Sequence, residues 1–168
     1  TNAWAKFESN QVSLEEFDEL FAKESKLAGH EIKGKEVISM LSGDLRPKMV
    51  ELLKLCKEQY KVACITNNVK AGRGPGMSTD DDKASKVSKV MALFDDVIES
   101  SIEGIRKPNP EIYKLACRRI SVEPEKCLFI DDLGINLKPA KELGMKTIKV
   151  LSEAQALKDI CLITNINL

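Results

Sequence analysis

Three short segments of this sequence combine residue types that suit the chemistry of phosphate groups. They are Thr66-Asn67-Asn68, Arg106-Lys107-Pro108 and Asp131-Asp132. A hydroxyl and neighbouring backbone N–H groups can hold phosphate oxygens, and a lysine can neutralise charge that develops during phosphoryl transfer. Paired carboxylates can hold Mg²⁺, which prefers oxygen ligands. Together the segments predict a site for phosphoryl transfer.

Each segment also has an ordinary structural explanation when it is taken alone. Thr66 fits a helix cap or a turn, and Lys107 before Pro108 fits a solvated loop. Asp131-Asp132 is harder to explain in this way, because two adjacent like charges after a buried run need a counterion. The order and spacing of all three segments favour a functional site over three unrelated structural roles.

Apolar runs in the second half of the chain are typical of strands that are buried on both faces. We expect strands at 62–66, 97–99, 127–131 and 147–150, and helices at about 83–94, 109–120, 136–143 and 152–160. Strand alternating with helix predicts an α/β fold with a doubly wound, parallel sheet. Ligands bind at the carboxyl ends of the strands in such sheets, so the three segments should converge on one edge.

The first quarter of the chain has a helical pattern. Ser13 should cap a helix with apolar residues at helical spacing, and Glu16 stands in the capping-box position. A short helix should precede it, and another should cover about 35–41. Pro47 should begin a further helix that runs to about Gln59.

Composition narrows the classes of partner. Lys plus Arg and Asp plus Glu number 26 each, so a net charge of zero gives no electrostatic case for nucleic acid or an anionic membrane surface. No apolar run approaches the roughly 20 residues that cross a bilayer. The five cysteines form no Cys-x-x-Cys pair and lie among apolar residues, which predicts reduced thiols in a cytoplasmic protein rather than zinc ligands.

The three segments resemble the second, third and fourth motifs of the haloacid-dehalogenase-like (HAD) hydrolases. The resembling stretches are residues 65–68, 106–113 and 129–140. The last stretch, continued to Met145, is most similar to the N-terminal phosphatase domain of soluble epoxide hydrolase and its bacterial relatives. The resemblance covers nearly the whole chain. It implies a Rossmann-type, three-layer core at 45–168 that lacks its first strand, and part of a helical cap at 1–44.

The same resemblance implies a role for each site residue. Thr66 and the Asn67 amide would bind phosphate, and Lys107 would bridge phosphate and nucleophile. Thr66 and Lys107 would thus be catalytic, and the substrate would be a small phosphorylated metabolite.

The metal side of the site follows from the last motif. Asp131 would ligate Mg²⁺, with Asp132 at or just behind the metal. Asn136, in the first turn of the following helix, would support these ligands from behind.

The family's first motif is an apolar strand that ends in Asp-x-Asp or Asp-x-Gly, and its first aspartate becomes an aspartyl phosphate. No such motif occurs before the expected cap. Asp80 and Asp82 have the Asp-x-Asp spacing, but they lie in the polar, glycine-rich stretch at 70–82, which is typical of a loop and not of a strand. In the family that strand lies between those ending here at Thr66 and Asp131, so these two should not pair directly. We expect it in a segment N-terminal to this chain. A cleaved, retained fragment or a second copy in a homo-oligomer would supply it.

Four functions remain open. The leading hypothesis is Mg²⁺-dependent hydrolysis of a phosphomonoester through an aspartyl phosphate, and the missing nucleophile keeps a catalytically inactive binding domain as the alternative. A response-regulator-like receiver also uses an acidic pair, Thr and Lys, but receivers place the acidic pair first. Dehalogenases of the same family work without a metal, whereas Asp131-Asp132 favours one.

Overall fold

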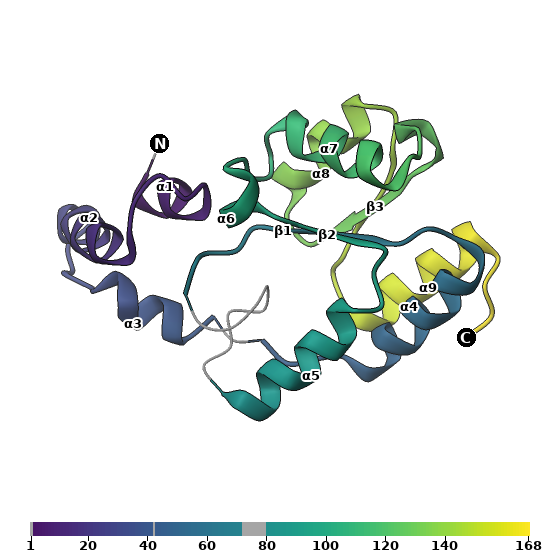
Figure 1. The fold of residues 1–168 in the computed structure, drawn as a ribbon, viewed down its shortest axis with the longest axis horizontal. Helices are drawn as coiled ribbons and strands as arrows, with labels where there is room; N and C mark the ends of the chain where they lie inside the picture. The colour runs from purple at the N-terminus through teal and green to yellow at the C-terminus, as the bar shows by residue number, and fades with distance from the viewer. Residues whose placement is uncertain (1, 42, 72–79) are drawn as a thin grey trace. The chain divides into compact units, whose positions relative to one another are not determined.

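The computed structural model describes residues 2–41, 43–71 and 80–168, which form two compact units (Figure 1). The first unit comprises Thr1–Asp44, Thr66–Met91 and Ile98–Arg106. The second comprises Leu45–Ile65, Ala92–Val97 and Lys107–Leu168. Most of the polar loop expected at 70–82 lies outside the described residues.

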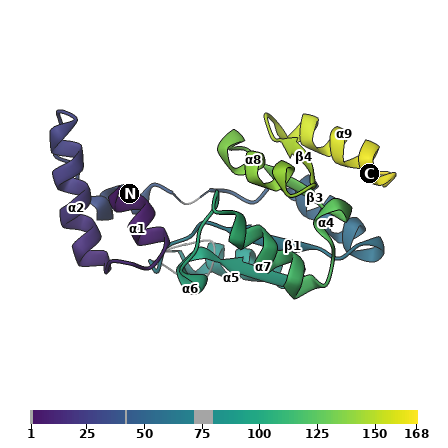
Figure 2. The ribbon, with the colours of Figure 1, turned by 90° about the horizontal axis from the view of Figure 1, so that it is seen from above.

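The first unit begins with the helices α1 (Ala3–Glu8), α2 (Leu14–Leu27) and α3 (Gly34–Ser39). The capping box is confirmed, because the Ser13 hydroxyl accepts from the Glu16 N–H and the Glu16 carboxylate accepts from the Ser13 N–H. α1 packs against α2 (Figure 2), where the rings of Phe7 and Phe17 stack with centroids 4.5 Å apart. Apolar burial therefore holds these short helices together.

Two further helices of the first unit differ from expectation. α5 (Asp81–Met91) starts earlier than predicted, because the Asp80 carboxylate accepts the Lys83 N–H at 2.7 Å, as a helix-capping side chain does. Asp82 therefore lies in a helix, and the loop expected at that position is wrong. α6 (Ser100–Glu103) was not predicted; it ends at Gly104, whose φ of 71° is the left-handed conformation that glycine adopts readily.

The second unit holds the remaining helices and most of the strands. α4 (Pro47–Gln59) has the predicted bounds and lies beside α9 (Glu153–Thr164) (Figure 1). The others are α7 (Pro110–Ile120), the 3₁₀ turn η1 (Pro124–Lys126) and α8 (Gly134–Glu142). Leu52, Ile148 and Ile160 form its apolar core. No helix in the described part of the chain is long and apolar enough to cross a membrane.

The strands are β1 (Ala63–Thr66), β2 (Asp96–Glu99), β3 (Leu128–Asp131) and β4 (Lys146–Lys149). β3 and β4 are parallel, as predicted, with Asp131 opposite Lys149. Within the described residues the strands form two two-stranded sheets, β1 with β2 and β3 with β4, and not the single doubly wound sheet that was expected. The expectation that β1 and β3 do not pair with each other is confirmed.

Candidate active site

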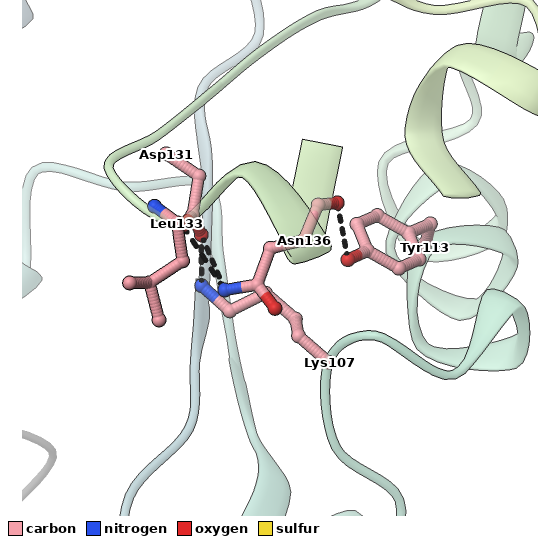
Figure 3. A network of polar contacts seen from close by, with 5 residues as sticks. All are labelled: Lys107, Tyr113, Asp131, Leu133 and Asn136. Atoms are coloured by element: carbon pink, nitrogen blue, oxygen red, sulfur yellow. Dashed lines mark hydrogen bonds and ion pairs between the residues drawn. The ribbon is translucent and has the colours of Figure 1, made fainter. Parts of the chain in front are cut away.

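A buried ion pair lies at the carboxyl end of β3. Asp131 is the last residue of the strand and is 8% exposed. The Lys107 ammonium lies 2.8 Å from its Oδ2 (Figure 3), and both side chains are largely removed from solvent. Lys107 thus supplies the counterion that the sequence required for this acidic position.

The turn after β3 holds the Asp131 carboxylate from the other side. The Leu133 N–H donates to Oδ1 at 2.8 Å, and the Asn136 side-chain amide donates to Oδ1 and Oδ2 at 3.0 and 3.2 Å. Asn136 can reach back in this way because α8 begins at Gly134, which places Asn136 in the first turn of the helix. The sequence had predicted Asn136 in the first turn of this helix, and its role behind a metal ligand stays a prediction.

Tyr113 supports this cluster and was missed as a site residue. Its hydroxyl donates to the backbone oxygen of Asn136 at 2.7 Å (Figure 3). Its ring packs edge-on against the ring of Phe129, with the centroids 5.1 Å apart. Burial, with the nearby Asp131 carboxylate, raises the pKa of Tyr113, so the hydroxyl remains a donor. The signal for this position was the apolar face of α7, where Ile112 and Ala116 are buried with it.

The acidic pair fits the carboxylate part of a magnesium site. Mg²⁺ is usually held by one or two carboxylates together with waters and substrate phosphates. Asp131 is buried and fixed in position, and Asp132 beside it is exposed. In the described ranges no group of three or more His, Cys, Asp or Glu side chains is placed to hold a metal ion. Among these residues the two aspartates alone would therefore be the carboxylate ligands.

The predicted phosphate-binding segment belongs to the first unit. Thr66 ends β1, and two residues later Asn68 is almost fully buried. The Asn68 N–H donates to the Ser100 hydroxyl, which donates back to the Asn68 carbonyl, at 3.0 and 3.1 Å. The Asn68 amide donates to Glu99 at 2.6 Å and accepts from the Ser101 hydroxyl at 3.0 Å.

This clasp, defined as Asn68 with residues 99–101, fixes the backbone directly after Thr66 and Asn67. Sequence reasoning named Asn68 as part of the motif but gave it no role, and it missed both serines. Ser100 and Ser101 follow a predicted strand directly, which was the one available signal. Fully satisfied buried polar groups of this kind hold a loop in one conformation.

The structure divides the predicted site residues between the two units. Thr66 and Asn67 are in the first, and the second holds the rest: Lys107, Asp131, Asp132 and Asn136. The convergence of both groups on one edge stays a prediction. Arg106, the other cation of its segment, forms a 2.5 Å ion pair with Glu8 of α1 within the first unit, which gives it a structural role there.

Comparison with known proteins places this geometry in a family. The family model of the haloacid dehalogenase-like hydrolases matches residues 3–144. The chain belongs to this family, as the resemblance of its motifs implied. Mouse acyl-CoA dehydrogenase family member 10 is 32% identical over 163 residues, which are 94% of this chain and 14% of that protein. Mouse bifunctional epoxide hydrolase 2 is 31% identical over 154 residues, 85% of this chain and 26% of that protein.

The chain therefore spans about a quarter or less of these two relatives. Glyceraldehyde 3-phosphate phosphatase of Pyrococcus furiosus is 34% identical over 85 residues, 47% of this chain and 35% of that enzyme. Among solved structures, a HAD-like hydrolase from Porphyromonas gingivalis has a TM-score of 0.69 at 22% identity, covering 98% of this chain and 80% of that one. A HAD enzyme from Bacteroides thetaiotaomicron, solved with magnesium and inorganic phosphate, has a TM-score of 0.63 at 23% identity, covering 90% of this chain and 75% of that one. These structures share the fold.

Proposed function

We propose that this chain is the larger part of a Mg²⁺-dependent phosphomonoester hydrolase that acts through an aspartyl phosphate. The nucleophilic aspartate would lie in a segment N-terminal to the chain. The observation that carries the proposal is the buried cluster of Lys107, Asp131 and Asn136 at the carboxyl end of β3. It holds a cation beside a carboxylate at a strand end, where ligands bind in α/β proteins.

The chain's own residues would bind and stabilise the phosphoryl group. The Lys107 side chain pairs with Asp131 and is largely shielded from solvent. In such surroundings a cation interacts more strongly with a phosphate oxygen than it does in water. The Thr66 hydroxyl and the Asn67 N–H would donate to phosphate oxygens, on a backbone that the Asn68 clasp holds still. Asp131 and Asp132 would hold Mg²⁺, which when bound supplies positive charge to the phosphoryl oxygens.

The substrate class rests on the relatives. One of them is named for hydrolysis of glyceraldehyde 3-phosphate, and a structure of the same fold was solved with magnesium and phosphate. These names support a small phosphorylated metabolite as the substrate. Fold alone does not identify which one.

A catalytically inactive binding domain is the second candidate. Lys107 and Asp131 already neutralise each other, and the motifs at the ends of the described strands β1 and β3 resemble the family's second and fourth, not its first. Such a domain would bind a phosphorylated ligand without hydrolysing it.

Activity assays separate the two candidates. The 168-residue chain and the product of its complete reading frame would be assayed with p-nitrophenyl phosphate and Mg²⁺, with and without EDTA. The proposal expects hydrolysis by the longer product only, lost with EDTA and in Asp131→Asn, because an amide holds Mg²⁺ poorly. Asp159→Asn, the same substitution on α9, should leave activity unchanged. EDTA-resistant hydrolysis by Asp131→Asn would contradict the mechanism, and phosphate binding without hydrolysis would favour the inactive domain.

A further inference from the structure

Two cysteine side chains meet where the chain passes from α7 to β3, within the second unit. The sulfurs of Cys117 and Cys127 lie 3.9 Å apart, in contact but not bonded to each other. Cys117 is in the last turn of α7, and Cys127 is the residue directly before β3. A pair of thiols therefore joins the end of the helix to the start of the strand. The candidate active site uses neither of them.

Backbone hydrogen bonds hold both cysteines in place. The Val122 N–H donates to the Cys117 carbonyl at 3.0 Å, where the chain leaves α7. The Cys127 N–H donates to the Pro124 carbonyl at 2.9 Å. The Cys127 carbonyl accepts from the Lys146 N–H at 3.0 Å, which ties it to the start of β4. Because the backbone is fixed at both positions, the two sulfurs remain neighbours.

The distance between the sulfurs is one that a disulfide can close. Bonded sulfurs lie about 2.05 Å apart. Each sulfur would therefore have to move by roughly 1 Å from the observed separation of 3.9 Å. The cysteines are ten positions apart, so the bond would close a short loop between α7 and β3.

The two thiols differ in exposure. Cys117 is 6% exposed, whereas Cys127 is half-buried and its sulfur also lies 3.4 Å from the Glu123 carbonyl. Both cysteines line a cavity of about 750 Å³, which has room for a small oxidant. Burial raises the pKa of both thiols, that of Cys117 to about 12. Cys127 should therefore react first, and slowly, because only the small thiolate fraction is nucleophilic.

We propose that Cys117 and Cys127 form an oxidisable dithiol, a modification site whose oxidant is hydrogen peroxide. The Cys127 thiolate attacks one peroxide oxygen and the O–O bond breaks, which gives a sulfenic acid and a hydroxide that takes up the thiol proton. The Cys117 sulfur then attacks the Cys127 sulfur and the S–O bond breaks. The departing hydroxide takes the Cys117 proton. In total, two thiols are oxidised to one disulfide and one peroxide is reduced to two waters.

The disulfide would link the two elements that hold the Asp131 cluster. Tyr113 lies four residues before Cys117 in α7, and Asp131 lies four residues after Cys127 at the end of β3. Closing a loop of this length restricts the unfolded chain, so the urea midpoint should rise by about 1 M on oxidation. The proposal concerns the thiols alone and does not depend on phosphatase activity, which the assays of the preceding section test separately.

Peptide mapping of the 168-residue chain tests the proposal. The folded chain is treated with hydrogen peroxide, its remaining thiols are blocked with iodoacetamide, and it is digested with trypsin without reductant. Trypsin cleaves after lysine and arginine except before proline, so the two cysteines fall in separate peptides, 115–118 and 127–141. Mass spectrometry should find these peptides joined, with the loss of two hydrogen atoms. Dithiothreitol should separate them and return the urea midpoint to its original value.

Single substitutions identify the order of the two steps. In Cys117→Ser the sulfenic acid lacks its neighbouring thiol, so dimedone, which reacts with sulfenic acids, should label Cys127. In Cys127→Ser, labelling of Cys117 should be at least about fivefold lower, because Cys117 is the more buried thiol. Cys64→Ser in β1 is the matched control and should leave the yield of linked peptide unchanged. Circular dichroism confirms that each variant is folded.

Several outcomes would overturn the proposal. Met40 is 76% exposed, and its conversion to the sulfoxide shows that the peroxide has acted. No linked peptide at that point would show that the two thiols are only packed together. Linkage of Cys127 to Cys56 or Cys64, or a linked peptide found only in covalent dimers, would assign the oxidation to a different pair. Equal dimedone labelling of the two serine variants would contradict the order of attack.

Discussion

Replacing Lys107 with methionine should destabilise the second unit more than any comparable change on its surface. The substitution keeps the length and apolar character of the side chain beside Phe129 but removes the ammonium that lies 2.8 Å from Asp131. The Asp131 carboxylate then stays buried, with 5% of its side chain exposed, and keeps only neutral donors from Leu133 and Asn136.

The size of the effect follows from that burial. Removing one partner of a buried ion pair costs about 3–5 kcal/mol, because the remaining charge is left uncompensated. The two neutral donors lower the cost, so we expect about 3 kcal/mol. Lys114→Met is the matched control, since Lys114 also lies 2.8 Å from a carboxylate, that of Glu111, but both side chains are exposed. An exposed pair of this kind contributes about 0.5 kcal/mol or less.

Urea unfolding followed by circular dichroism measures the difference. With a slope of about 2 kcal/mol per molar, Lys107→Met should lower the midpoint by about 1.5 M and Lys114→Met by about 0.2 M. A double-mutant cycle of Lys107→Met with Asp131→Asn should give a coupling energy of at least about 2 kcal/mol. Equal midpoints for the two lysine variants would show that the buried pair contributes no more than a surface pair.

Two further predictions test the clasp and the buried thiols. Asn68→Asp removes the amide that donates to Glu99 and sets two carboxylates together, so unfolding followed by Trp4 fluorescence should show a loss of about 2 kcal/mol. Asn2→Asp, which keeps an acceptor at its helix cap, should have almost no effect. Burial raises the pKa of Cys117 from 9.0 to about 12, so its contribution to stability is present below pH 9 and is lost as the pH rises toward 12. The urea midpoint of Cys117→Ala should therefore fall less between about pH 8 and 10.5 than that of the unchanged chain; parallel profiles would contradict this.

The helices and strands of this protein were largely predictable because their signals are local. Ser13 with Glu16 marks a helix start through contacts three residues apart, and Pro47 fixes the first turn of α4. The early start of α5 was missed, although Asp80 caps it locally, because the glycine-rich stretch before it favoured a loop. The four-residue α6 is too short to show a helical period in the sequence.

The candidate site was predictable in its residue types but not in its contacts. The types and order of Thr66, Lys107 and Asp131 indicated phosphate chemistry. The acidic pair at the end of a buried strand also indicated that a counterion lies nearby. The sequence did not determine that Lys107 would meet Asp131 across 24 positions. Nor did it identify Tyr113, which supports the Asp131 cluster, or the two serines that hold Asn68.

The sequence by itself determined the α/β class, the family and the order of the elements, since these depend on apolar periodicity and on short motifs. Only the tertiary structure decided which charges neutralise each other and which strands pair. Hydrogen bonds between strands and ion pairs between distant residues depend on which edges and side chains meet in space, and no local pattern encodes that. The two-stranded pairing of β1 with β2 and of β3 with β4, with a cavity lined by both β1 and β3, is of this kind.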